Sequence, residues 1–502
     1  MKKTFKLLSL LLCLLMILSV FSACLGSDKD VQNTENEDLG AASTDNEGVD
    51  GADLYDANGY LKDDLPETYN FDSDFVIYSW DGQKHWEWEE DDTKAVGDTV
   101  EEALWFREKN VETRFGITMT RAYQKGEWSD MGTFINSLAV SVLANDRLYD
   151  MVSQYTAAAG LGTAAGLYSD LVGNQYINLE KPWWPEAMIE SASIGDELYF
   201  ATGDITPTLF RHSHCMFVNL DMWNQYELSN LVDGKTIFQV VEDYEWTLET
   251  MITLSTGKVA MDDSVSDSFR KYGISFYNSA IIDAFLYGGG FTCIENVDGI
   301  MRLSESLGGS DLVDWTEEVS LLFNNGYPDI ICGGENTTTT DWFASSRAIF
   351  YGGQATHSVD FSAANVNFTM LPMPMASSAQ KQYRTCATMY VSMFSIPVDA
   401  DPTMSGVIFE ALGSEAYRTV SDVVYENFFK YRHNAHSEDT AKMFDLVFDT
   451  VVFDPARSFS QEFGLFGAFR NTILEKGSWT DTYASYKEAW SDRIEDLYLK
   501  LG

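Results

Sequence analysis

The sequence is poor in basic residues and in long apolar runs, and each scarcity excludes a class of function. Lysine and arginine together number 33 against 77 aspartates and glutamates, so the net charge is −44. A surface this acidic repels nucleic-acid phosphates and anionic headgroups, which excludes DNA, RNA and direct binding to a membrane surface. After residue 21 no apolar run approaches the roughly 20 residues that a membrane-spanning helix needs.

Cysteine is also scarce, with six in 502 residues. Cys13 and Cys24 belong to the N-terminal region. The other four are spread irregularly over the body of the chain: Cys215, Cys293, Cys332 and Cys386. They form no CxxC pair, which argues against a zinc cage, and one or two disulfides remain possible. We expect no metal or other cofactor.

Catalytic signatures are present only as fragments. Gly234-Lys235-Thr236 is half of a phosphate-binding loop, because Ser229 stands where the first glycine belongs. Residues 160–165 fit a loose dinucleotide fingerprint, but small residues that open a helix over a sheet explain them better. His212-Ser213-His214 has no third metal ligand nearby in the sequence. These absences favour a binding protein over an enzyme.

The chain begins with the features of a secretory signal. Basic residues open it, residues 7–21 are almost entirely apolar, and Ser22-Ala23 precede Cys24. A cysteine after Phe-Ser-Ala resembles the bacterial lipobox, in which that cysteine becomes the lipidated first residue. We therefore expect residues 1–23 to be a signal peptide and Cys24 to anchor the chain by lipid at the extracytoplasmic face of the cell membrane. The acidic composition of residues 24–70 predicts a disordered tether.

From residue 71 the pattern is that of a folded α/β domain of two or more parts. Residues 75–80 read as a buried strand, residues 98–115 as an amphipathic helix and residues 117–120 as the next strand. A helix over 134–144 and a strand over 149–153 complete a β-α-β-α-β order, which predicts a mainly parallel sheet.

Later segments continue in the same style. We expect a helix to begin at Thr247 as its N-cap, strands near 348–351 and 389–396, and helices from 404 to 501. Ligands bind parallel sheets outside the carboxyl ends of the strands. Trp80-Asp81 and Gln154-Tyr155 stand at two such ends, which makes them the first candidates for ligand contact.

A series of short segments, spread from Cys24 to about Asp454, occurs in the same order as in a known protein family. The segments are 56–66, Asp204, Phe217-Val218-Asn219, 244–248, Leu371-Pro372-Met373-Pro374, Gln382-Tyr383 and Glu410-Ala411-Leu412. Together with the lipobox, the series resembles the extracellular solute-binding family that includes maltose-binding protein, and most closely its sugar-type binding lipoproteins. The resemblance covers most of the chain.

The resemblance implies an α/β, two-lobe periplasmic-binding-protein-like fold of type II, whose hinged lobes close on a ligand in the cleft between them. It places crossovers of the chain near residues 204–218, 351–358 and 391–396. Lobe 1 is then expected to comprise residues 71–207 plus 355–392, and lobe 2 residues 208–354 plus 393–502.

Aromatic residues make up 14% of the chain, and sugar-binding clefts use aromatic faces together with a few placed polar groups. The candidate ligand-binding residues are Trp80, Asp81, Gln154, Tyr155, Asp204, Tyr287, Tyr351 and Tyr390. The alternative for each aromatic residue is an ordinary place in the core.

The sequence thus predicts a monomeric substrate-binding lipoprotein of an ABC importer that delivers a carbohydrate to membrane permease subunits. A neutral oligosaccharide is the expected ligand, because no basic cluster marks an anion site. The alternatives are a transport lipoprotein that binds a peptide or a modified sugar, a surface polysaccharide hydrolase with two carboxylates facing across the cleft, and a scaffold without a ligand.

Overall fold

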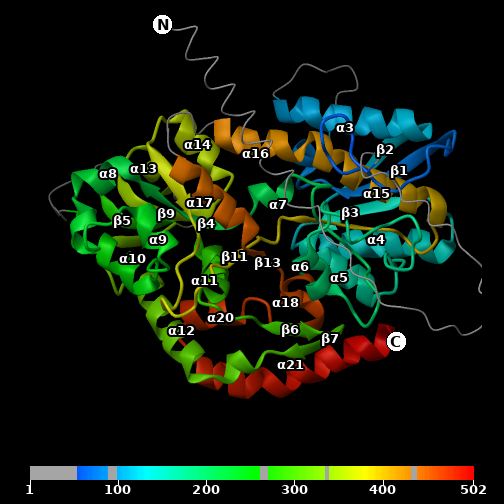
Figure 1. Cartoon of the computed structure of the whole chain (residues 1–502). Coiled ribbons are helices and arrows are strands. Elements are labelled where there is room, and N and C mark those ends of the chain that lie inside the picture. The colour runs from blue at the N-terminus through cyan, green and yellow to red at the C-terminus, as the bar shows by residue number, and fades with distance from the viewer. Residues whose placement is uncertain (1–53, 89–98, 260–269, 334–338, 431–437, 502) are drawn as a thin grey trace, which may run out of the picture. The chain divides into compact units, whose positions relative to one another are not determined.

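Two β-sheets organise the part of the chain that carries the candidate site. The computed structural model describes residues 54–88, 99–259, 270–333, 339–430 and 438–501, and residues 55–502 belong to one compact unit. The predicted signal peptide, Cys24 and most of the predicted tether lie outside the described residues. Figure 1 shows the two sheets with helices packed around each of them.

The first sheet is built from the predicted β-α-β-α-β segment. Its strands, in order, are β12 (Ser392–Ser395), β3 (Met151–Tyr155), β1 (Ser73–Trp80) and β2 (Ile117–Gln124). Strand β1 pairs in parallel with both β2 and β3, whereas β12 runs antiparallel to β3. Both faces of β1 are covered, so its second half reads as a continuous buried run rather than as an alternation.

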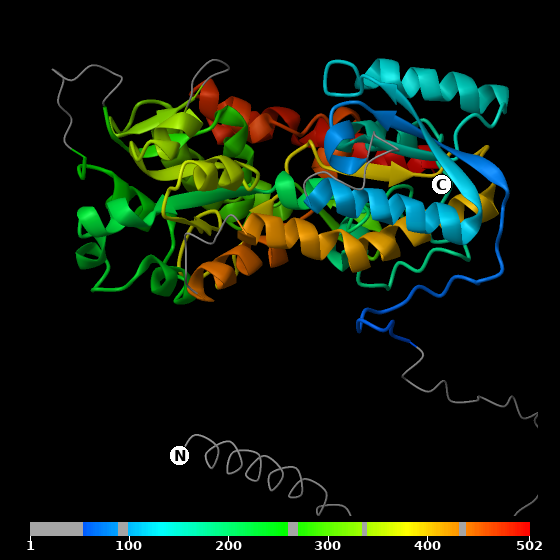
Figure 2. The ribbon, with the colours of Figure 1, turned by 90° about the horizontal axis from the view of Figure 1, so that it is seen from above.

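Long helices cover this sheet. They are α3 (Thr99–Phe115), α4 (Met131–Ala144), α5 (Thr156–Ala164) and α15 (Pro402–Thr419). Helix α15 lies alongside α3, as both views show (Figures 1 and 2). Asp401 caps α15 by accepting the N–H groups of Thr403 and Met404, and Pro402 occupies the first turn, where its missing N–H costs nothing.

The second sheet is mixed. Its strands, in order, are β10 (Phe368–Leu371), β4 (His214–Asn219), β9 (Ala348–Gln354), β5 (Tyr272–Phe276) and β8 (Ile330–Cys332). Strand β5 is parallel to β8 and β9, and β4 is antiparallel to β9 and β10. The parallel pair places the carboxyl ends of β5 and β9 at one edge, and the antiparallel β4 brings its amino end to that edge.

Helices and short strands complete the fold. The remaining helices are α2 (Lys84–Glu87), α6 (Glu186–Ala192), α7 (Thr208–Arg211), α8 (Leu220–Gln225), α9 (Ile237–Glu242), α10 (Leu248–Ser255), α11 (Ile282–Gly288), α12 (Ser310–Phe323), α13 (Thr339–Ala344), α14 (His357–Ala363), α16 (Ser421–Lys430), α17 (Glu438–Asp449), α18 (Pro455–Ser458), α19 (Ser460–Phe463), α20 (Ala468–Leu474) and α21 (Trp479–Leu501). Strands β6 (Ile294–Val297) and β7 (Ile300–Leu303) pair antiparallel, and β11 (Thr385–Cys386) pairs in parallel with β13 (Val451–Val452). The N-cap predicted at Thr247 is confirmed, because its hydroxyl accepts the Thr250 N–H.

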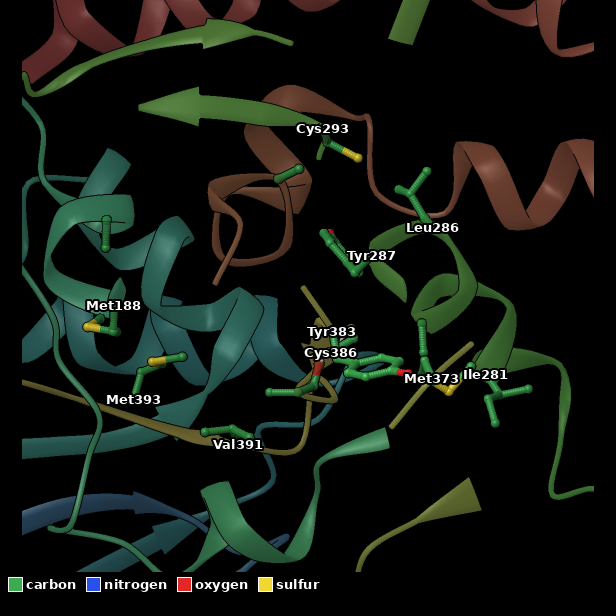
Figure 3. Packing of buried hydrophobic residues seen from close by; sticks show 14 of the residues in the cluster. Met188, Ile281, Leu286, Tyr287, Cys293, Met373, Tyr383, Cys386, Val391 and Met393 are labelled. Atoms are coloured by element: carbon green, nitrogen blue, oxygen red, sulfur yellow. Dashed lines mark hydrogen bonds between the residues drawn. The ribbon is translucent and has the colours of Figure 1, made fainter. Parts of the chain in front are cut away.

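The cores are rich in large aromatic and sulfur-containing side chains. Figure 3 shows part of the largest buried cluster, in which Tyr287 of α11 lies among Cys293, Tyr383 and Cys386. The four body cysteines are all free, and three of them are buried. Burial raises the pKa of these thiols and so keeps them protonated, which makes them small apolar packing groups.

The strand pairing differs from the lobe boundaries expected from the sequence. Strand β10 lies within the stretch assigned to lobe 1, yet it pairs with β4 of the second sheet. Strand β12 falls, except for Ser392, in the stretch expected in lobe 2, yet it pairs with β3 of the first sheet. The chain therefore returns to the first sheet between residues 371 and 392, and not near 351–358. An apolar run predicts a strand but carries no information about which sheet completes its ladder.

The last part of the predicted tether is packed against the folded body, which corrects its boundary. Leu65 is buried, and the Asp63 carboxylate accepts hydrogen bonds from both Nη atoms of Arg114 at 2.8 Å and from the Ser414 hydroxyl at 2.7 Å. Composition alone favoured an extended tether, because Arg114, which neutralises Asp63, and Ser414, which donates a hydrogen bond to it, come from elsewhere in the chain.

Candidate ligand-binding site

A cavity of about 650 Å³ lies where strand ends of the two sheets meet. Its walls include residues that follow β1 and β2 of the first sheet, the last residue of β3, and residues at the carboxyl ends of β5 and β9 of the second sheet. The antiparallel strands β4 and β12 bring the segments before their amino ends to the same place. Helices α11, α18 and α20, which Figure 1 shows in the region between the sheets, supply the remaining side. The volume falls within the range of about 300–1,000 Å³ that holds small-molecule ligands.

Aromatic side chains form the side contributed by the first sheet. Tyr155 ends β3 and Tyr390 precedes β12, and their rings meet edge to face with centroids 5.6 Å apart. Trp80 lies fully buried against both rings, with centroids 5.4 Å from Tyr155 and 6.2 Å from Tyr390. The Trp80 indole N–H donates to the Ser392 hydroxyl at 2.9 Å, which fixes the ring. Trp80 therefore supports the aromatic surface without forming it.

Two aromatic residues, Trp128 and the Tyr390 just described, keep large exposed areas at the cavity. Trp128 is 48% exposed and Tyr390 is 37% exposed, although both are large side chains that ordinarily gain stability from burial. The Trp128 ring also contacts Phe466, with centroids 5.8 Å apart. Exposed aromatic rings next to polar groups can stack on the apolar C–H faces of a sugar ring.

Neutral histidines and glutamines form a polar side. His212 Nδ1 lies 2.9 Å from Gln354 Oε1, and its Nε2 lies 3.0 Å from Gln83 Oε1. Burial lowers the pKa of His212 to about 4 and that of His214 to about 3, so both rings are neutral at neutral pH. A neutral imidazole donates through one nitrogen only, so His212 donates a hydrogen bond to just one of these two glutamine oxygens.

Charged groups gather on the side contributed by α11, α18 and α20. The Asp283 carboxylate lies 3.2 Å from Arg470 Nη2 and 3.9 Å from Arg457 Nη1. Burial raises the pKa of Asp283, and the two arginines oppose that shift. The Phe466 ring lies close to both guanidinium groups, with its centroid 5.2 Å from Arg457 Cζ and 5.3 Å from Arg470 Cζ.

The structure brings two of the eight predicted ligand-binding residues, Tyr155 and Tyr390, to the cavity, with Trp80 directly behind them. Asp81 is half-buried after β1 and is not among the residues that line the cavity. The Gln154 side chain is buried, donating to the Ser395 hydroxyl and accepting from the Tyr168 hydroxyl.

The other three predicted residues lie apart from the cavity lining. Tyr287 is buried in the hydrophobic cluster of Figure 3 and is not among the residues that line the cavity. The Tyr351 hydroxyl lies 2.9 Å from the Thr340 hydroxyl and 3.1 Å from His357 Nδ1, inside an aromatic core. Asp204 accepts a hydrogen bond from the Ser421 hydroxyl, and burial raises its pKa to about 7.

Several lining residues were missed by the sequence analysis. Trp128, Tyr277 and Gln354 follow or end β2, β5 and β9, and the strand-end argument applied to those strands could have found them. Gln83 follows β1, two residues beyond the predicted Asp81. Arg457, Phe466 and Arg470 come from the C-terminal helical region, where no strand end marks them. Within the described residues, no group of three or more His, Cys, Asp or Glu side chains is placed to hold a metal ion.

No protein-family model matches the chain, and no curated protein matches its sequence. Its structure is similar to those of solved solute-binding proteins. The cyclic α-maltosyl-1,6-maltose binding protein from Arthrobacter globiformis aligns with a TM-score of 0.56 at 10% identity, over 84% of this chain and 99% of that one. The galacto-N-biose/lacto-N-biose I-binding protein of a Bifidobacterium longum ABC transporter, solved with lacto-N-biose, gives 0.54 at 10% identity over 84% and 97%. The GacH receptor of Streptomyces glaucescens, solved unliganded and with acarbose, gives 0.54 at 10% identity over 84% and 99%.

These similarities define the fold. The chain has the two-lobe α/β fold of the periplasmic binding proteins of the maltose-binding type, which confirms the fold that the sequence resemblance implied. Across the described ranges, no helix combines the length and the apolar character needed to cross a membrane.

Proposed function

We propose that this chain is the extracytoplasmic component of an ABC importer that captures a carbohydrate and delivers it to a membrane permease. The observation that carries the proposal is the aromatic-walled cavity at the strand ends of two sheets. Cyclic maltosyl-maltose, lacto-N-biose and acarbose are ligands of three solved proteins that share the fold. The exposed faces of Trp128 and Tyr390 supply the stacking surfaces that such ligands require.

Capture follows from the placement of the cavity. A ligand in it touches residues that follow strands of both sheets, so it bridges the two lobes and shifts the population toward the closed form. Tyr390 and His212 lie on the segments that lead into β12 and β4, where the chain passes between the sheets. The closed form then presents its surface to the permease.

A thermal-shift screen of the full chain against mono- and oligosaccharides, with short peptides alongside, tests the capture step. A ligand at a hundredfold excess over its Kd adds about 2.7 kcal/mol, which raises Tm by a few degrees. Tyr390→Ala is expected to weaken binding by at least about tenfold, or roughly 1.4 kcal/mol. Tyr486→Ala, an exposed tyrosine on α21 outside the cavity lining, is the matched control.

The same samples separate the alternatives. Recovery of the glycan uncut supports capture, whereas cleavage of the glycan would establish the hydrolase alternative. Stabilisation by peptides alone would replace the carbohydrate with a peptide ligand. If no member of the panel raised Tm, the capture proposal would be lost.

The proposal includes lipid anchoring through Cys24 and residence as a monomer at the outer face of the membrane. It is supported by the lipobox-like sequence Phe21-Ser22-Ala23-Cys24. In a bacterial host, the full chain is expected to partition with membranes and Cys24→Ser to be released into the soluble fraction. Membrane association of Cys24→Ser equal to that of the unaltered chain would refute the anchor.

A further inference from the structure

The charge of the cavity is opposite to that of the chain. The whole sequence carries −44, yet the charged residues that line the cavity in the described part of the chain are Arg457, Arg470 and Asp283, an excess of one positive charge. The lining histidines His212 and His214 are neutral at neutral pH, as described above, and change nothing in this count. Glu127 reaches the Tyr390 hydroxyl at 3.5 Å but does not line the cavity.

Arg457 is the least satisfied of these groups. The residue is only 7% exposed, and its Nη1 is buried without a hydrogen-bond partner among the described residues. Asp283 lies 3.9 Å from that nitrogen, which is ion-pair distance but too long for a hydrogen bond. A buried guanidinium is costly unless its N–H groups are hydrogen-bonded, so Arg457, which lines the cavity, has room for a further acceptor.

Nearby carboxylates are already engaged. Asp283 is shared between two arginines and lies closer to Arg470, at 3.2 Å. The Asp454 carboxylate accepts the backbone N–H groups of Cys293, Ile294 and Ala456 at 2.7, 3.3 and 2.9 Å. Because the two arginines share the single carboxylate of Asp283, one positive charge is not balanced, and the pair can bind a second anion.

The two guanidinium groups are also held in place. Phe466 contacts both of them through its ring, as described above, and Trp128 contacts Phe466 from the aromatic side of the cavity. A planar guanidinium with a fixed orientation is well suited to the two oxygens of a carboxylate or to a sulfate. A sugar that stacks on Trp128 would therefore lie next to the arginine pair.

We infer that the cavity takes an anionic carbohydrate, a sugar whose carboxylate or sulfate group binds at Arg457 and Arg470 while its ring stacks on the aromatic side. This inference rests on the proposed function and narrows its ligand class. An anionic sugar replaces the neutral oligosaccharide that was expected from the sequence. That expectation rested on the absence of a basic cluster in the sequence. The two arginines are separated along the chain by α19 and a loop, so they form a cluster only in the fold.

The test is isothermal titration calorimetry of the full chain with matched pairs of glycans. The probes are di- to tetragalacturonates, hyaluronan oligosaccharides and sulfated chondroitin disaccharides, each paired with its carboxyl-reduced or desulfated form. We expect at least one acidic probe to bind ten or more times more tightly than its neutral partner. A preference for the carboxylated over the sulfated pairs, or the reverse, identifies the anion.

Arg470→Gln is the diagnostic variant, because Arg470 is partly exposed and its replacement is less disruptive than that of the buried Arg457. We expect it to abolish the preference for the acidic probe, so that the acidic and the neutral partner bind with similar affinity. Arg302→Gln, which removes the same charge from an exposed position on β7 outside the cavity lining, should change neither affinity. A circular-dichroism melt confirms that each variant is folded.

The outcomes separate the two claims. Equal affinity for acidic and neutral partners, or a preference that survives in Arg470→Gln, would overturn the anionic ligand and leave the carbohydrate importer standing. Failure of every glycan, acidic and neutral alike, would overturn the proposed function together with this inference.

Discussion

The two sides of the cavity differ in kind. The side from the first sheet is aromatic, and the rings of Tyr155 and Tyr390 pack against Trp80. The side from the C-terminal helices is charged, with Asp283, Arg457 and Arg470. An aromatic side offers apolar area that many sugars can cover, whereas buried charges penalise any ligand that fails to pair with them. Affinity is thus expected to come mainly from the first side and selectivity from the second.

Within the aromatic side, support and contact are divided between different residues. Trp80 is fully buried, and its ring is fixed by Ser392, whereas Trp128 is half exposed and its ring contacts Phe466. Replacing a residue of each kind therefore separates stability from binding.

The largest effect is expected for Trp80→Ala. Removal of a fully buried tryptophan should lower the free energy of unfolding by about 3–5 kcal/mol, measured by urea denaturation. Trp128→Ala should cost less than about 1 kcal/mol of stability while weakening glycan binding. Similar losses of stability in the two variants would contradict the division between support and contact.

The difference between the two sides also explains what the sequence could predict. The aromatic side follows from local order along the chain. Residues 75–80, 117–120 and 149–153 were recognised as strands, and structure places β1, β2 and β3 there within a few residues. Because strands run parallel, their carboxyl ends meet, and Tyr155 could be placed at such an end before any fold was known.

The charged side could not be found in this way. Arg457 and Arg470 lie in the helical C-terminal region, and only the tertiary fold, in which α20 packs against α11, brings both of them to Asp283. Sheet membership escaped prediction for the same reason, since β10 and β12 find their ladders only in the tertiary fold. For Tyr351 the error is the opposite one: the sequence predicted a ligand contact, and the structure places the side chain in a core. A tyrosine near an expected hinge has the same sequence context in both cases.

A pH effect of intermediate size is expected on the polar side, at His214. Burial lowers its pKa to about 3, while the unfolded chain titrates near its ordinary value of about 6.5. Between these values the unfolded state binds more protons, so His214 makes the protein less stable as the pH falls below about 6.5. At pH 5 the loss is about 2 kcal/mol relative to pH 7.5.

His214→Gln should reduce this dependence. The measurement is the urea unfolding free energy of both proteins at pH 7.5 and pH 5. His212 and His357 also have lowered pKa values and remain in the variant, so it should lose less stability on acidification than the unaltered chain but still lose some. An unchanged loss would mean that His214 accepts a proton in the folded state as readily as in the unfolded one.

The smallest effect is expected where the sequence suggested a ligand contact and the fold offers a core. Tyr351→Phe removes only the hydroxyl that contacts Thr340 and His357, so stability should fall by about 1 kcal/mol. Glycan affinity should be unchanged, because Tyr351 is fully buried and does not line the cavity. Titration calorimetry beside Tyr390→Ala makes the comparison direct. A tenfold loss of affinity in Tyr351→Phe, with the melting temperature unchanged, would move the ligand site away from the cavity and toward the second sheet.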